Sequence, residues 1–140
     1  MKLILCVDDR GGMLFGGRRL SRDRAVCQHI LNMAGGAALW MNAYSQKLFS
    51  EFEGNLCVYS GDPDQVAADA YLFAEDLDIE DLLCKADALI LYRWNRVYPS
   101  DVRLPLPLSE AKWKLVTAED FPGNSHEKIT CEVYIHEEVS

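Results

Sequence analysis

The stretch DAYLFAEDLDIEDLLCKADALILYRW (residues 69–94) decides the fold class of this chain. Its apolar run Ala70–Ala74 predicts a short strand, and Ala88–Tyr92 is the clearest buried strand in the sequence. Between them, Asp78–Cys84 predicts a short helix. A strand, a helix and a second strand in this order are typical of α/β proteins, in which helices cover the faces of a central sheet.

The rest of the chain continues this alternation and ends in two strands, which indicates a layered α/β sheet with an antiparallel C-terminal hairpin. Lys2–Val7 is short and apolar, which predicts a buried strand. A helix is expected to begin at Ser21 or Asp23 and to end at Gly35-Gly36. The other expected elements are strands at Ala37–Met41, Leu56–Ser60, Trp113–Thr117 and Ile129–Ile135, a helix at Asn42–Phe52, and loops or polar segments at Asp9–Gly17, Gly61–Asp64, Val97–Leu108 and Ala118–Lys128.

Length and composition indicate one soluble domain, residues 1–140, of which 49% of the residues are hydrophobic and 26% charged. The apolar run Leu3–Val7 is too short for a signal peptide or a membrane span, so we expect a cytoplasmic protein that does not enter a membrane. The five cysteines are not closely spaced, and the three histidines show no paired spacing. This pattern argues against a disulfide framework, a zinc site and a metal-dependent hydrolase.

Basic charge is concentrated in a chain whose net charge is −8. This net charge disfavours nucleic-acid binding, because the phosphate backbone repels an acidic surface. Arginine recognises phosphate and carboxylate groups with two hydrogen bonds, so clustered arginines predict an anionic ligand or an acidic partner. The plain alternative is a solvated turn that balances the acidic remainder. One arginine group consists of Arg10, Arg18, Arg19, Arg22 and Arg24, and the other of Arg93, Arg96 and Arg103.

The order of these elements along the chain resembles that of the dihydrofolate reductase family. The resemblance rests on the first strand and its glycine-rich loop, on AALWMNAYSQKLF (37–49), LCVYS (56–60) and residues 69–94, and on the closing strands in WKLVTAEDFPGNSHEKITCEVYIHEE (113–138). It implies a three-layer α/β sandwich whose mixed, mostly parallel central sheet ends in antiparallel strands. It also implies that the loop after the first strand covers an active site.

The sequence departs from the family pattern where the cofactor binds. The family ends one strand in two glycines that let backbone N–H groups approach a pyrophosphate, and this chain has Ala74-Glu75-Asp76 there. A carboxylate pair repels phosphate, so NADPH is disfavoured although it stays possible. The family's glycine-arginine-x-threonine turn is replaced by Asn42-Ala43-Tyr44-Ser45. Tyr44, Ser45 and Ser60 are the residues expected on the former cofactor side.

Asp23 lies near the position where the family keeps its buried acid, which implies a role in binding and protonating a pterin ring. Its alternative role is that of an acid in the first turn of a helix, which the helix dipole stabilises. By the same resemblance, a ligand is expected to contact Arg10, Met13, Arg18, Arg19, Cys27, Arg93, Trp94 and Arg96.

Three functions remain open from sequence. The first is a divergent protein of this fold that has lost the NADPH site and binds a small anionic or heterocyclic ligand. The second is an active NADPH-dependent reductase of a pterin-like substrate, with Asp23 as the acid. The third is a non-catalytic module that docks an acidic partner. A homodimer is compatible with each of them.

Overall fold

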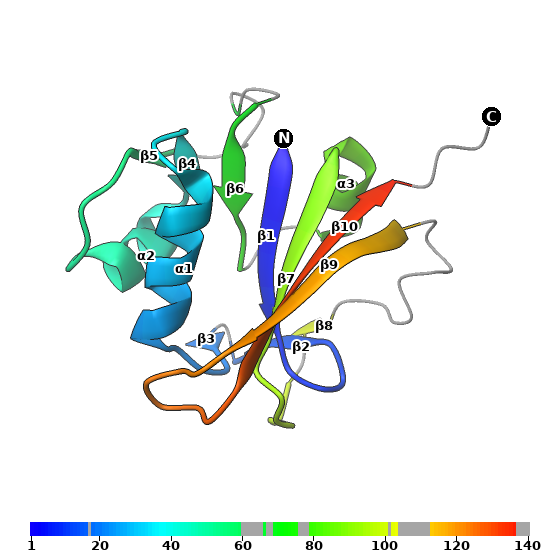
Figure 1. Cartoon of the computed structure of the whole chain (residues 1–140). Coiled ribbons are helices and arrows are strands. Elements are labelled where there is room, and N and C mark those ends of the chain that lie inside the picture. Colours follow the sequence, from blue (N-terminus) through cyan, green and yellow to red (C-terminus); the bar gives the residue numbers. More distant parts are fainter. Residues whose placement is uncertain are drawn as a thin grey trace.

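A twisted sheet runs through the centre of the computed structural model (Figure 1). The structure describes residues 1–16, 18–59, 66, 69–75, 79–100, 102–103 and 113–136. Within these residues the sheet has seven strands in the order β5-β4-β6-β1-β7-β10-β9. The strands are β1 (Lys2–Val7), β4 (Leu39–Met41), β5 (Leu56–Val58), β6 (Tyr71–Phe73), β7 (Ala88–Arg93), β9 (Trp113–Phe121) and β10 (Ile129–His136).

The strands of the sheet pair in parallel, except where the two C-terminal strands β9 and β10 take part. Strand β1 pairs in parallel with β6 and with β7, and β4 pairs in parallel with β5 and β6. Strand β10 runs antiparallel to both β7 and β9. The predicted mixed, mostly parallel sheet with an antiparallel C-terminal hairpin is therefore confirmed.

Helices cover both faces of the sheet, which makes the three layers. Alternate residues of a strand point to opposite faces. Leu3, Leu5 and Val7 pack in the cluster that contains Leu82 of helix α3 (Ile79–Lys85). Ile4 packs on the other face, in the cluster that contains Ile30 of helix α1 (Arg24–Ala34). Figure 1 shows α1 beside the short helix α2 (Ala43–Gln46).

Helix α1 begins and ends where the sequence predicts. Asp23 is its N-cap, and the Asp23 side chain accepts a hydrogen bond from the Ala25 N–H. Gly35 ends the helix with a φ of 58°, a left-handed conformation that glycine adopts without strain. The helix predicted over Asn42–Phe52 is shorter: Asn42 caps α2, and a 3₁₀ turn, η1 (Lys47–Phe49), follows.

The glycine-rich segment after β1 is not the simple loop that the sequence predicts. It contains strands β2 (Gly12–Phe15) and β3 (Arg18–Arg19). These two strands form a small sheet with β8 (Val102–Arg103), which lies within the predicted loop Val97–Leu108. A Cβ atom on Gly12 would lie 2.6 Å from Ser100 Oγ and 2.9 Å from Asp8 Oδ1. The glycine is therefore required for close packing within a strand, not for flexibility.

The polar segment predicted to separate the last two strands begins later than expected. Strand β9 continues beyond Thr117 through Ala118, Glu119 and Asp120 and ends at Phe121. These residues are exposed on a strand at the end of the sheet, where polar side chains remain in water. No helix in the described part of the chain is both long and apolar enough to span a membrane.

Candidate functional site

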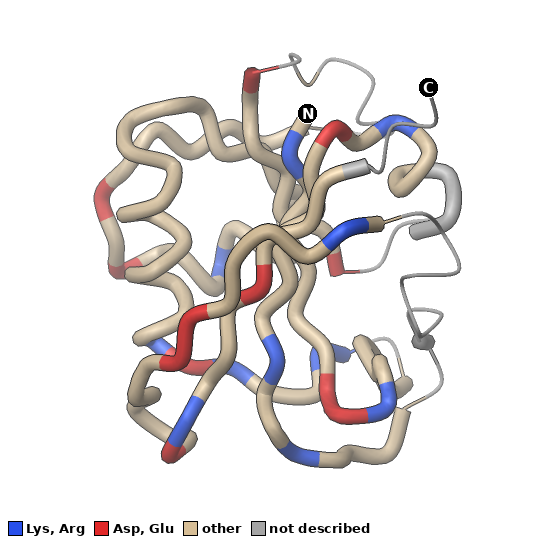
Figure 2. Tube along the Cα trace, turned by 45° about the vertical axis from the view of Figure 1, so that its right-hand side comes forward, with Lys and Arg blue, Asp and Glu red and all other residues tan. Residues whose placement is uncertain are grey.

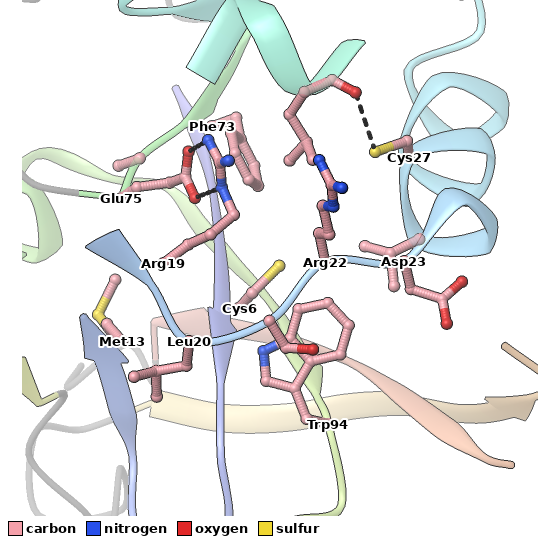
Figure 3. A pocket seen from close by; sticks show the side chains of 14 residues that line it. Cys6, Met13, Arg19, Leu20, Arg22, Asp23, Cys27, Phe73, Glu75 and Trp94 are labelled. Atoms are coloured by element: carbon pink, nitrogen blue, oxygen red, sulfur yellow. Dashed lines mark hydrogen bonds and ion pairs between the residues drawn. The ribbon is translucent and has the colours of Figure 1, made fainter. Parts of the chain in front are cut away.

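A cavity lies at the carboxyl ends of the parallel strands, where open α/β sheets bind ligands (Figure 3). Strand β1 contributes Cys6 to its lining, β6 contributes Phe73, and Trp94 follows β7. The segment that leads from β3 into α1 lines the side of the cavity that faces the helix. The enclosed free volume is about 20 Å³, so the cavity is narrow. The lining residues are Cys6, Met13, Arg19, Leu20, Ser21, Arg22, Asp23, Val26, Cys27, Leu48, Phe73, Ala74, Glu75 and Trp94.

An ion pair closes one side of this cavity. Arg19 Nε lies 2.7 Å from Glu75 Oε2 and Arg19 Nη2 lies 2.9 Å from Glu75 Oε1, so the guanidinium donates to both carboxylate oxygens (Figure 3). Ser45 Oγ donates to Glu75 Oε1 at 2.7 Å. Burial alone would lower the pKa of Arg19, but its hydrogen bonds to Glu75 outweigh that effect and raise it. Arg19 therefore stays charged.

Tyr44 completes the surroundings of Arg19. The Arg19 guanidinium lies over the Tyr44 ring, 4.4 Å from its centroid. The backbone N–H of Arg19 donates to the Tyr44 hydroxyl at 3.3 Å. Two residues predicted to contact a cofactor, Tyr44 and Ser45, thus bind the ion pair in this structure.

Asp23 is buried and its carboxylate is saturated with donors. The backbone N–H groups of Asn124 and Ser125 and the Ala25 N–H each donate to it at 2.8 Å. Burial alone would raise the Asp23 pKa, but the hydrogen bonds from Asn124, Ser125, His126 and Ala25 outweigh burial and lower it to about 2. The carboxylate is therefore ionised at neutral pH and fixes the turn between β9 and β10 against the start of α1.

His126 connects this turn to the cavity wall. Its Nδ1 lies 3.1 Å from Asp23 Oδ2, and its Nε2 lies 3.1 Å from Ser21 Oγ and 3.1 Å from the Tyr98 hydroxyl. The Trp94 ring stacks on the imidazole with centroids 4.7 Å apart. No local sequence pattern predicts this cluster, because Ser21 and His126 are 105 residues apart.

A wider groove adjoins the cavity and shares Arg22, Asp23, Cys27 and Leu48 with it. Its volume is about 430 Å³, and it runs between the start of α1 and η1. Arg24 is paired with Glu51 at 3.1 Å, and the exposed side chains of Arg22 and Lys47 also line the groove. The groove is therefore locally basic in an acidic protein. Its lining also includes Ser50, Phe52, Asn124 and Ser125.

The two arginine-bearing loops lie side by side, but not all their arginines reach the cavity. The Asp9 N–H donates to the Arg96 carbonyl at 2.7 Å, which joins the loops. Figure 2 shows basic and acidic segments next to one another at the end of the molecule where β2 lies. Arg93 pairs with Glu132 on β10. Of the predicted ligand contacts, Met13, Arg19, Cys27 and Trp94 line the cavity, whereas Arg10, Arg18 and Arg96 are exposed outside its lining, and Ser60 lies outside the described residues.

In the described part of the chain, no three His, Cys, Asp or Glu side chains are grouped so that they could hold a metal ion. Asp76 of the predicted carboxylate pair lies outside the described residues, so only Glu75 of that pair is placed.

Comparison with known proteins gives no match to a family model or to a curated protein. Among solved structures, dihydrofolate reductase from Enterococcus faecalis in complex with NADP(H) and RAB-propyl matches with a TM-score of 0.67 and 12% sequence identity. The match covers 98% of this chain and 96% of that chain. The chain has a dihydrofolate-reductase-like fold. Because the likeness spans nearly all of both chains, the ion pair of this dihydrofolate-reductase-like protein lies within a shared framework.

Proposed function

We propose that this dihydrofolate-reductase-like protein has lost the NADPH site and binds a small anionic ligand, with an apolar or heterocyclic body, in the groove between α1 and η1. The observation that carries the proposal is the Glu75 carboxylate with its partners Arg19 and Ser45. By resemblance, Glu75 occupies the turn where the family has glycine and brings its backbone against a pyrophosphate.

The charge at Glu75 works against a bound diphosphate. Two like charges about 4 Å apart cost about 4 kcal/mol at an effective dielectric constant near 20. The charge of Arg19 offsets part of this cost, but its guanidinium already donates to both Glu75 oxygens and is held by them. A phosphate that recruited Arg19 would leave Glu75 buried without its counter-ion, which is a larger penalty.

The groove offers what a small anion needs. Its volume of about 430 Å³ falls in the usual range for small-molecule sites. Arg22 and Lys47 supply positive charge, and Figure 3 shows Arg22 pointing from the chain before α1 toward the segment of α2 and η1. Leu48 and Phe52 supply apolar surface against which a flat ring can pack.

The state of Asp23 disfavours the reductase alternative. A carboxylate that accepts three backbone N–H groups, and whose pKa is about 2, holds no proton to deliver to a pterin at neutral pH. The same bonds leave it engaged with the protein, whereas a ring with an amino group would require free acceptor oxygens.

Calorimetric titration and thermal denaturation with NADPH, inorganic phosphate, citrate and pterin-6-carboxylate test the proposal. We expect citrate or pterin-6-carboxylate to bind and NADPH not to bind. The double variant Arg22→Glu/Lys47→Glu should lose that binding, whereas Lys114→Glu/Lys128→Glu, with the same change of charge outside the groove, should keep it.

Other results would select the alternatives. Binding of NADPH that is lost in Asp23→Asn would overturn the proposal and favour the reductase. A lack of response to all four compounds, together with a dimer in light scattering, would favour an interaction module instead.

A further inference from the structure

Three side chains from two distant segments of the sequence form a continuous hydrogen-bonded chain beside the cavity. Ser21 Oγ lies 3.1 Å from His126 Nε2, and His126 Nδ1 lies 3.1 Å from Asp23 Oδ2. Ser21 and Asp23 come from the link between β3 and α1, and His126 comes from the turn between β9 and β10. A hydroxyl, an imidazole and a carboxylate in this order are the arrangement that activates a serine as a nucleophile.

The surroundings of Asp23 fix the protonation of the imidazole. The Asp23 carboxylate is ionised, accepts N–H groups on both oxygens and has no proton to donate. The bond between Asp23 and His126 therefore requires the proton on Nδ1. Nε2 is then left as an acceptor, with the hydroxyls of Ser21 and Tyr98 both within hydrogen-bond distance of it. This is the tautomer that a general base needs.

The imidazole is held rigidly in this orientation. The His126 side chain is 3% exposed, and the Trp94 ring stacks on it. Gly123 brings the turn close to Asp23, because a Cβ atom there would lie 2.5 Å from Asp23 Oδ2 and 2.8 Å from the His126 carbonyl oxygen. The Tyr98 hydroxyl is a second partner of Nε2 at 3.1 Å. The Tyr98 oxygen can accept a hydrogen bond from Nε2–H once the imidazole is charged.

Ser21 is placed to meet a substrate. Unlike His126, it is only half-buried, and it lines the cavity at the strand ends. The apolar side chains of Leu20, Val26 and Trp94 line the same cavity. The enclosed free volume of about 20 Å³ is little more than one water molecule needs, so the cavity excludes long acyl chains.

We propose that Ser21 is an acyl-accepting nucleophile, with His126 as its general base and Asp23 as a positioning residue, and that the cavity takes short-chain carboxylic esters. Ser21 Oγ forms a bond to the ester carbonyl carbon while its proton passes to His126 Nε2. The C–O bond to the leaving alcohol then breaks, and His126 returns the proton to that oxygen. Water repeats the same sequence on the acyl-serine, which releases the carboxylic acid and restores the hydroxyl.

The ester reaction uses Ser21 and His126, neither of which lines the proposed anion groove, so it can be tested separately from anion binding. Incubation of the whole chain with p-nitrophenyl acetate tests it by two readouts. Release of p-nitrophenolate gives the rate, and peptide mapping by mass spectrometry after acid quenching locates the acetyl group. We expect the acetyl group on Ser21.

Single-residue variants distinguish a loss of the acetylation reaction from a loss of the folded structure. His126→Asn should slow acetylation of Ser21 by about 10²- to 10⁴-fold, the usual contribution of a general base. Ser21→Ala should abolish the acetylated peptide, and Thr117→Ala, which removes an exposed hydroxyl from β9, should react like the parent chain. Thermal denaturation of each variant shows whether it is folded.

Acetyl groups found only on lysines, cysteines or the N-terminal amine would overturn the proposal. So would an equal rate of acetylation at Ser21 in the parent chain and in folded His126→Asn, because a serine that is merely exposed needs no base from His126.

Discussion

Arg19 and Glu75 face each other at the carboxyl ends of the parallel strands and share two hydrogen bonds of 2.7 and 2.9 Å. Their side chains are 18% and 8% exposed, so both charges are largely removed from water. The pair joins the hairpin of β2 and β3 to the end of β6, in the centre of the sheet. Removal of one partner leaves the other as an uncompensated buried charge.

We therefore expect Arg19→Met to lower the free energy of unfolding by about 3 kcal/mol. Urea denaturation at pH 7 measures the change. Arg24→Met is the matched control, because it breaks the exposed pair of Arg24 with Glu51, and such pairs contribute less than about 1 kcal/mol. Equal losses in the two variants would show that Glu75 does not need its partner. Arg19→Met/Glu75→Leu should recover part of the loss.

The stability of the protein should fall in acid through Asp23. Its pKa drops from the usual 3.8 to about 2 on folding, so the ionised carboxylate stabilises the fold above about pH 4. That contribution, about 2 kcal/mol, disappears as the pH falls toward 2. Asp23→Asn should be less stable at pH 6 and should approach the parent chain near pH 2.

Urea denaturation of both chains between pH 2 and pH 6 measures this difference. Glu127→Gln removes an exposed acid from the same turn and should leave the curve of the parent chain almost unchanged. A constant gap between the parent chain and Asp23→Asn across the pH range would contradict the assignment, because it would show that ionisation of Asp23 is not the cause.

Gly123 should not tolerate a side chain. In Gly123→Ala, the new Cβ would lie within 2.8 Å of both the His126 carbonyl oxygen and Ile129 Cδ1, so the turn has to move. We expect a loss of about 1–3 kcal/mol in the free energy of unfolding, as in other overpacked sites. Gly54→Ala should cost less, since its nearest neighbour, at 3.0 Å, is the end of the Leu31 side chain.

Proton NMR distinguishes a displaced turn from a general loss of stability. The ring-current shifts of His126 that arise from Trp94 should change in folded Gly123→Ala and should persist in Gly54→Ala. Unchanged His126 signals in Gly123→Ala would contradict the close packing.

Cysteine reactivity should separate surface thiols from core thiols. Burial raises the pKa of Cys27 to about 12 and that of Cys131 to about 11, whereas Cys84 is exposed. Because the thiolate is the reactive form, iodoacetamide at pH 8 should modify Cys84 first and the two core cysteines only after unfolding. Mass spectrometry of the native protein, with Cys84→Ser as control, measures the order; early modification of Cys27 would show that the wall of the cavity opens.

Local sequence patterns predict much of this fold, because they depend on neighbouring residues. The buried strand β1 follows from its continuous apolar run, and the two ends of α1 follow from an N-cap acid and a left-handed glycine. Strand β2 does not follow from such patterns. The tight contacts of Gly12 with Ser100 and Asp8 explain its glycine, and these contacts are visible only in three dimensions.

The site was predictable only in part for the same reason. The sequence indicates Asp23 both as a helix cap and as a group near a pocket, and the structure places it at the helix start with its backbone donors. The charge of Glu75 was apparent from sequence, but its pairing with Arg19 was not, since the partners are 56 residues apart. His126 gave no signal, because its partners come from two other segments of the chain.

The dependence of the cavity wall on the last two strands has a consequence for biosynthesis. Ribosomes extend a chain from its N-terminus, so β1, α1 and β7 emerge well before residues 113–136. During that interval the carboxylate at the start of α1 lacks Asn124, Ser125 and His126, and β7 lacks its antiparallel neighbour. A nascent chain stalled before β9 therefore exposes an unfinished sheet edge, which makes it a substrate for chaperones until translation resumes.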